Sequence, residues 1–112
     1  MTVYGLSQSS GVERLLEVEK ADGGLLLHVH DQPDQAQEQI VVSDGDLISA
    51  LTDGGAGPRT LEGAAPGNGT RKFLDIEVRR NEVLLVVRPE AGAGCDIAIG
   101  FDDLQDAVEA AA

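Results

Sequence analysis

Residues 14–30 read RLLEVEKADGGLLLHVH, and residues 72–88 read KFLDIEVRRNEVLLVVR. In the first stretch apolar and polar residues alternate on both sides of a short polar turn, Asp22-Gly23. In the second stretch they alternate before the turn, and an apolar strand follows it. Alternation with a period of two is typical of β-strands, and Asp-Gly between two such runs is a strong hairpin signal. The two stretches therefore predict two antiparallel β-hairpins.

The pairing within each hairpin predicts which side chains share a face. A two-residue turn places Glu17 opposite His28 in the first hairpin, and Phe73 opposite Arg88 in the second. One face of each hairpin is then wholly apolar, and we expect these faces to form the core. Their residues are Leu16, Val18, Leu25, Leu27 and Val29 in the first hairpin, and Leu74, Ile76, Val83, Leu85 and Val87 in the second.

The two hairpins belong to a longer internal repeat. An offset of 58 positions aligns them with each other and also aligns residues 2–5 with residues 60–63. After one deletion, residues 40–42 align with residues 97–99. Self-similarity at a fixed spacing indicates a tandem duplication. We interpret residues 2–53 and 60–110 as two copies of a ββββα unit.

The expected fold follows from this repeat. Strands are predicted at 2–6, 14–20, 24–30 and 39–43 in the first unit, and at 60–63, 71–79, 82–88 and 95–99 in the second. A helix opens near Ser43 in the first unit and ends at Gly54-Gly55, and a second helix carries the apolar stripe that begins at Phe101. Residues 54–59, rich in Gly and Pro, form the predicted linker.

A unit of about fifty residues with one helix cannot bury its sheet alone. We therefore expect one α+β domain over residues 1–112, in which the two units pack as an intramolecular pseudo-dimer. Each unit would contribute an antiparallel sheet and one helix around a pseudo-twofold axis.

Charge and composition narrow the class of protein. The chain has 20 acidic and 8 basic residues, a formal net charge of -12 and a single cysteine. Residues 1–11 lack the features of a signal peptide, and no apolar run approaches the roughly 20 residues that span a bilayer. The sequence contains no phosphate-binding loop, nucleophile elbow or spaced Cys/His pair. We expect a cytoplasmic protein that is neither membrane-bound nor an enzyme, and that has no cofactor.

Two histidines raise the question of a metal. His28 and His30 alternate along one predicted strand, so both rings lie on the same face and could bind zinc together with a carboxylate. We favour a cross-strand ion pair between Glu17 and His28, because no third ligand is evident. The second unit has Val86 and Arg88 at the matching positions. The prediction is therefore no metal, with zinc binding as the alternative.

The outer face of the predicted sheets is the candidate binding face. It is mixed in character and contains Glu17, His28, His30, Phe73, Asp75, Glu77 and Arg88. A cation–π contact is expected between Phe73 and Arg88. Four further residues form a predicted basic patch in the second unit: Arg71, Lys72, Arg79 and Arg80.

Part of the second unit resembles a known family. Residues 72–77 (KFLDIE) are followed by Asn81, an apolar strand, residues 97–99 and a helix from Phe101 to Ala107. This order, together with the tandem ββββα repeat, resembles the Whirly and Pur-alpha (PUR-repeat) group of single-stranded nucleic-acid-binding proteins over nearly the whole chain. The resemblance implies a Whirly-like fold and an affinity for single-stranded DNA or RNA.

Two functional hypotheses follow. The leading one is a non-enzymatic binding or regulatory module that engages another protein through the acidic, mixed sheet face, because a charge of -12 attracts basic partners and repels phosphate. The alternative is weak binding of single-stranded nucleic acid through Phe73, Arg88 and the basic patch. Homodimerisation is left open.

Overall fold

The computed structural model describes residues 1–31, 35, 37–52 and 58–112. Within these residues, four strands and a helix are followed by four more strands and a second helix. The first group comprises β1 (Thr2–Leu6), β2 (Glu13–Ala21), β3 (Gly24–His30), β4 (Gln37–Val42) and α1 (Asp44–Thr52). The second comprises β5 (Pro58–Ala64), β6 (Arg71–Val78), β7 (Glu82–Pro89), β8 (Cys95–Gly100) and α2 (Phe101–Ala111).

All eight strands begin and end within two residues of the positions expected from the sequence. The largest differences, of two residues, lie at the starts of β4 and β5, and β5 therefore includes Pro58 and Arg59 of the predicted linker. The rest of that linker, residues 54–57, lies outside the described residues, as does the predicted helix end at Gly54-Gly55.

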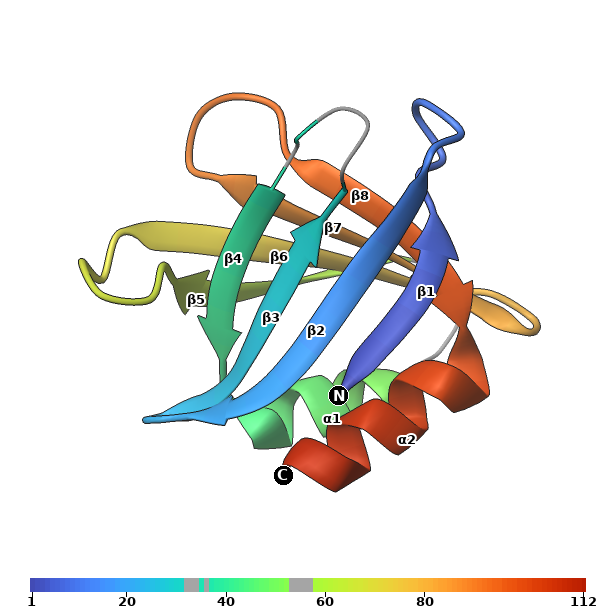
Figure 1. The fold of residues 1–112 in the computed structure, drawn as a ribbon. Helices are drawn as coiled ribbons and strands as arrows, with labels where there is room; N and C mark the ends of the chain where they lie inside the picture. The colour runs from blue at the N-terminus through green and yellow to red at the C-terminus, as the bar shows by residue number, and fades with distance from the viewer. Residues whose placement is uncertain (32–34, 36, 53–57) are drawn as a thin grey trace.

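The strands form one closed antiparallel barrel in the order β1 to β8, with β1 next to β8 (Figure 1). This corrects the expectation of a separate sheet in each half. An open four-stranded sheet would leave unpaired N–H and C=O groups along its edges, and closure pairs some of them. The two four-stranded sheets meet at two short seams, each with one pair of Cα partners. These pairs are Leu6 with Ala98 and Val41 with Ala64.

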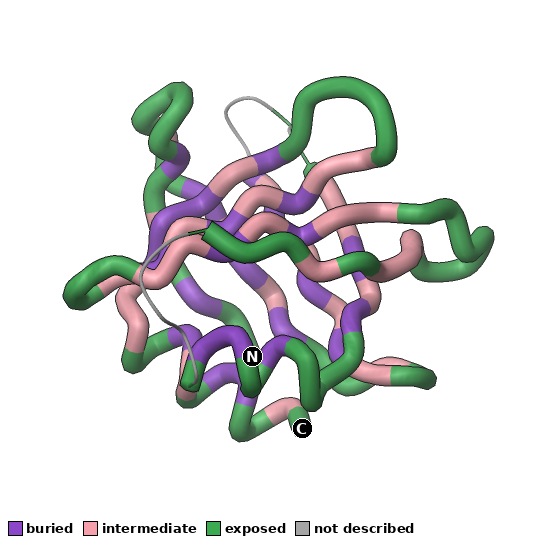
Figure 2. Tube along the Cα trace, turned by 180° about the vertical axis from the view of Figure 1, so that it is seen from behind, coloured by how far each residue is buried: buried purple, intermediate pink, exposed green. Residues whose placement is uncertain are grey.

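The predicted hairpin registers are confirmed. Glu17 pairs with His28, and Phe73 pairs with Arg88. All ten apolar residues of the two predicted core faces are at most 1% exposed. Figure 2 shows buried and less buried positions alternating along the strands. Burial of each Leu, Ile or Val side chain stabilises the fold by roughly 1.5–3 kcal/mol, so the barrel interior is the main source of stability.

Both helices lie together at one end of the barrel (Figure 1). They cover this end with buried side chains that include Leu47 and Leu51 from α1 and Leu104 and Val108 from α2. The Oγ atom of Ser43 accepts a 3.4 Å hydrogen bond from the backbone N–H of Asp46, as expected for a residue that caps a helix. No helix in the described part of the chain has the length and apolar character needed to cross a membrane.

A glycine lies at each seam. A Cβ atom on Gly5 would overlap the carbonyl oxygen of Ala98, and a Cβ atom on Gly63 would overlap the carbonyl oxygen of Val41. Only glycine permits so close an approach of two backbones. These two positions therefore allow the sheets to close into a barrel.

Candidate functional site

The predicted binding face is divided between two walls of the barrel. Three of its residues lie on β2 and β3 and four lie on β6 and β7 (Figure 1). The first group is Glu17, His28 and His30, and the second is Phe73, Asp75, Glu77 and Arg88. In the closed strand order, β2 and β6 are four strands apart in either direction, so the two groups cannot act as one surface.

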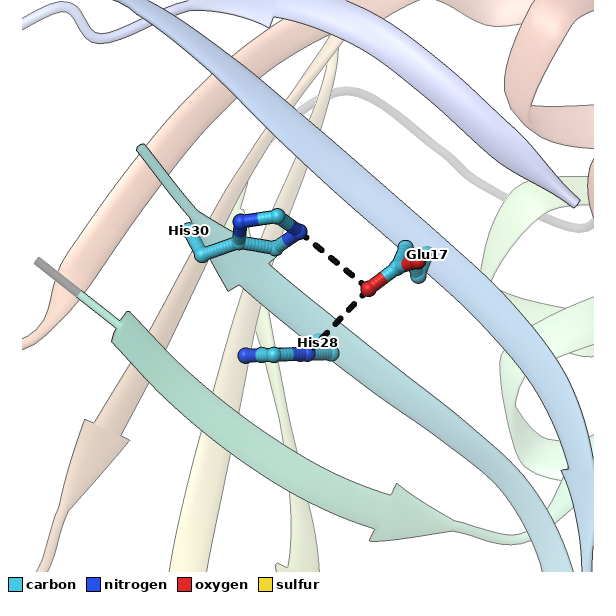
Figure 3. A group of neighbouring side chains, drawn as sticks. All are labelled: Glu17, His28 and His30. Carbon is cyan, nitrogen blue, oxygen red and sulfur yellow. Dashed lines mark hydrogen bonds and ion pairs between the residues drawn. The ribbon is translucent and has the colours of Figure 1, made fainter. Parts of the chain in front are cut away.

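Glu17, His28 and His30 form a compact cluster on the first wall (Figure 3). The strand register places Glu17 directly opposite His28, and its carboxylate also reaches the diagonal neighbour His30. Oε2 of Glu17 lies 3.3 Å from Nδ1 of His28 and 3.1 Å from Nε2 of His30. Ligand atoms from the three residues all lie within 4.8 Å of one another. The cluster therefore supplies a third potential metal ligand, which sequence reasoning did not identify.

A fourth side chain positions one of the two rings. Nε2 of His28 lies 3.3 Å from Oε1 of Gln37 on β4. In the tautomer that donates Nε2–H to this oxygen, Nδ1 of His28 carries a free lone pair toward Glu17. The His28 and His30 side chains are 22% and 26% exposed, and Glu17 is 40% exposed, so a small ligand can reach the cluster from solvent.

The second wall is organised around Phe73. The predicted contact with Arg88 is confirmed, because the guanidinium carbon lies 4.9 Å from the ring centroid. Arg71 lies over the same ring at 5.2 Å, a contact that the sequence analysis missed although residues 71 and 73 share a strand face. Two arginines over one ring resemble a stacking site, and their charges are compensated by neighbouring carboxylates.

Asp75 is the main partner of Arg88. Nε of Arg88 lies 2.6 Å from Oδ2 of Asp75, and Nη2 lies 3.2 Å from Oδ1. These hydrogen bonds are the largest influence on the pKa of Asp75 and lower it; burial opposes them, and the Thr60 hydroxyl reinforces them. The pKa of Asp75 therefore lies below its ordinary value. The bidentate pair occupies both side chains and leaves this wall without a free cation at Arg88.

The predicted basic patch is largely neutralised. Three of its four residues form ion pairs: Arg71 with Glu62 and Glu90, Lys72 with Glu38, and Arg79 with Glu77 and Glu82. Proteins that bind single strands combine a positive groove with aromatic platforms. Because most of this patch is matched by carboxylates, it offers little net positive charge to a phosphate backbone.

A surface that the sequence analysis did not identify lies at the helix end of the barrel. The two helices carry six carboxylates and no Lys, Arg or His: Asp44, Asp46, Asp102, Asp103, Asp106 and Glu109. Among the described residues, none of these six takes part in an ion pair. The signal in the sequence was α2 itself, in which four of the five polar residues are acidic and none is basic.

Apolar side chains adjoin these carboxylates. Met1 and Tyr4 are 60% and 66% exposed. With Asp103 and Asp106 of α2 they line a shallow depression between the start of the chain and the helix. We refer to Met1, Tyr4, Asp103 and Asp106 as the helix-end surface. An exposed apolar patch with a charged rim is typical of an interaction site.

A buried ionic network lies where β2 begins, at the barrel end away from the helices (Figure 1). Nε of Arg14 lies 2.8 Å from Oδ2 of Asp31, and Nη1 lies 2.9 Å from Oδ1 of Asp96. Burial would raise the pKa of Asp96, but hydrogen bonds from the Ser9 and Ser7 hydroxyls and from nearby backbone N–H groups lower it below its ordinary value. The network joins β2 to β8 across the β1–β8 seam and has a structural role.

No family model, curated protein or solved structure matches this chain. The Whirly and PUR-repeat resemblance therefore stays a prediction, and the function is argued below from the geometry of this protein.

Proposed function

We propose that this chain is a non-enzymatic binding module that engages a basic protein through its helix-end surface. The observation that carries the proposal is the charge of the two helices, which bear six carboxylates and no basic side chain. Elsewhere on the barrel, ion pairs between described residues involve at least five of the eight basic side chains. The unmatched negative charge therefore concentrates at the helices.

Helix stability explains only some of these carboxylates. Asp102 and Asp103 lie in the first turn of α2, where a negative charge is favourable. Glu109 lies near the other end of α2, where the helix dipole disfavours a negative charge by about 0.3–1 kcal/mol. No basic residue occupies the last turn of either helix. Because the charge of Glu109 does not stabilise its own helix, we infer that it serves binding to another molecule.

The exposed apolar groups supply the second element of an interface. Tyr4 is 66% exposed and adjoins Asp103 and Asp106 in the same depression. Tyrosine is enriched among the residues that dominate binding energy, and a polar rim around it excludes water. Complementary charge steers association and selects the partner. This arrangement supports a partner that presents Lys or Arg side chains around an apolar contact.

The helix-end surface lies apart from the sheet face that the sequence alone favours as the interaction surface. On the two barrel walls, the acidic residues Glu17, Asp75 and Glu77 each have a His or Arg partner within 3.5 Å. Such compensated charges attract an incoming partner less than the unpaired carboxylates of the helices do.

The test uses a photo-crosslinking amino acid in place of Tyr4 to capture and identify a partner, followed by affinity measurements on the purified pair. We expect a basic partner whose affinity falls at least tenfold for Tyr4→Ala and for the double variant Asp103→Lys/Asp106→Lys. Increasing salt should weaken binding of the unmodified chain, because ions screen exposed charges.

A matched control separates a specific surface from general acidity. Glu13 is an exposed acidic residue on β2 and makes no ion pair among the described residues, so Glu13→Lys adds a positive charge away from the helices. Binding should be nearly unchanged in this variant. If Glu13→Lys weakens binding as much as the double variant Asp103→Lys/Asp106→Lys does, or if Tyr4→Ala has no effect, the proposed surface is wrong.

We also infer that the two halves arose by duplication and act as an intramolecular pseudo-dimer. The offset of 58 that aligns the hairpins also relates Gly5 to Gly63, and each glycine packs against the backbone of the neighbouring half. If the halves are equivalent, a chain made of two tandem copies of residues 53–112, which include all of β5 and the residues that connect it to the preceding helix, should unfold cooperatively. A gradual, non-cooperative transition would contradict this inference.

A further inference from the structure

We propose that Glu17, His28 and His30 form a binding site for Zn²⁺. Zinc holds imidazole nitrogen and carboxylate oxygen at roughly 2.0–2.2 Å in a tetrahedron, so neighbouring ligand atoms lie roughly 3.3 Å apart. The Oε2 atom of Glu17 is 3.3 Å and 3.1 Å from the two histidine nitrogens. Two of the three ligand-to-ligand distances therefore already match such a site.

The third distance requires only a modest adjustment. All three ligand atoms lie within 4.8 Å of one another, and the ring centroids of His28 and His30 are 4.6 Å apart with a tilt of 31°. Both rings are partly exposed, so they can rotate toward a common point without displacing the core. The backbone already holds the three residues next to one another, because the histidines are two residues apart on β3 and Glu17 is the cross-strand partner of His28.

Gln37 acts as an outer-shell partner in this arrangement. A metal-binding histidine usually donates its other ring N–H to an oxygen acceptor, which fixes the tautomer and the ring orientation. Nε2 of His28 lies 3.3 Å from Oε1 of Gln37, while Nδ1 faces Glu17. His28 therefore has the hydrogen-bond partner that a ligand binding through Nδ1 requires.

The second half provides an internal comparison. An offset of 58 converts the three positions into Asp75, Val86 and Arg88. There the carboxylate forms a bidentate ion pair with Arg88, and no metal can be held because guanidinium has no free lone pair. A single cationic side chain therefore pairs fully with the carboxylate at this position of the second half. In the first half two imidazoles face the carboxylate instead. An ion pair between Glu17 and His28 would require only one of them.

The donor set indicates the class of metal. Two imidazoles and one carboxylate suit zinc and other transition metals, whereas Mg²⁺ and Ca²⁺ prefer oxygen ligands alone. Three protein ligands leave one position of the tetrahedron open. Because the cluster lies on the outer wall of the barrel, solvent can occupy this position.

The test is titration of the purified chain with zinc sulfate by isothermal calorimetry, and with Co²⁺ by visible absorption. We expect one zinc ion per chain and a cobalt spectrum typical of tetrahedral coordination, with no comparable binding of Mg²⁺. His28→Gln, His30→Gln and Glu17→Gln should each weaken zinc binding by more than tenfold. Gln37→Ala should weaken it about 10- to 100-fold, as expected for an outer-shell partner.

Controls distinguish this site from weak binding by surface carboxylates. Arg88→Gln alters the matching position of the second half and should leave zinc affinity unchanged. Circular dichroism checks that each variant keeps its fold. The proposal is overturned if the chain fails to bind zinc at about 1 mM. It is also overturned if folded variants that lack either histidine bind zinc as well as the unmodified chain does.

Discussion

Substitution of Arg14 by methionine should destabilise this protein far more than the same substitution at an exposed arginine. The Arg14 side chain is 7% exposed, and its partners Asp31 and Asp96 are 0% and 14% exposed. Methionine preserves much of the side-chain volume but leaves these carboxylates without their cation. Removing one member of a buried ion pair costs about 3–5 kcal/mol, because the other charge remains buried and uncompensated.

The effect can be measured by urea unfolding followed by circular dichroism. With a slope of about 2 kcal/mol per molar urea, a loss of about 4 kcal/mol lowers the midpoint by about 2 M. Such a loss is a large part of the roughly 5–15 kcal/mol that stabilises a typical domain. Arg71→Met is the matched control, because the Arg71 and Glu62 side chains are 51% and 58% exposed. An exposed pair contributes about 0–1 kcal/mol.

A second variant tests the mechanism. Asp31→Asn added to Arg14→Met removes the more deeply buried of the two carboxylate charges that have lost Arg14, so the double variant should be more stable than Arg14→Met alone. If Arg14→Met and Arg71→Met lose the same stability, burial does not control the strength of these pairs. If the second substitution only adds further loss, the buried charge of Asp31 is not the cause of the destabilisation.

Two further predictions concern stability. The pKa of Asp96 is lowered in the folded chain, so its stabilising contribution is complete above the unfolded pKa near 3.9 and is lost as pH falls through the lower folded value. The stability difference between the unmodified chain and Asp96→Asn should therefore shrink between pH 7 and pH 3 in urea titrations, and a constant difference would contradict this sign. Gly63→Ala should destabilise the chain by about 1–3 kcal/mol in the same assay, because the new methyl group meets the carbonyl of Val41. Gly45→Ala is the control, because a Cβ atom on Gly45 would have no neighbour closer than 3.8 Å. Alanine in place of glycine in a helix should stabilise the chain by up to about 1 kcal/mol. If both variants lose the same stability, backbone contact at the seam is unimportant.

Much of the fold was predictable because the hairpins are local. Asp22-Gly23 determines the first register, and once Glu17 lies opposite His28 the core face follows from alternation. Barrel closure was not predictable in this way. Each seam contains a single pair of Cα partners, such as Leu6 with Ala98, and neither residue type signals which edge it will meet.

In the candidate sites, too, contacts between direct strand neighbours were predictable and more distant contacts were not. The contact of Phe73 with Arg88 was predicted, because the two residues are direct cross-strand neighbours. The reach of Glu17 to His30 was missed, because it is diagonal across the strands and depends on side-chain conformation. The contact between Arg14 and Asp96 joins residues 82 positions apart across a seam, and no local pattern in the sequence indicates it.

The two seams also have a consequence for assembly at high concentration. Each half closes the barrel by offering both of its sheet edges to the other half, and a second molecule offers the same edges. The covalent connection between the halves keeps the internal partner at an effective concentration of about millimolar, which far exceeds that of a free molecule in dilute solution. Closure within one chain is therefore favoured when the protein refolds in dilute solution. Refolding in concentrated solution instead favours exchange of halves between two chains, which produces domain-swapped dimers in which every barrel keeps the same strand order.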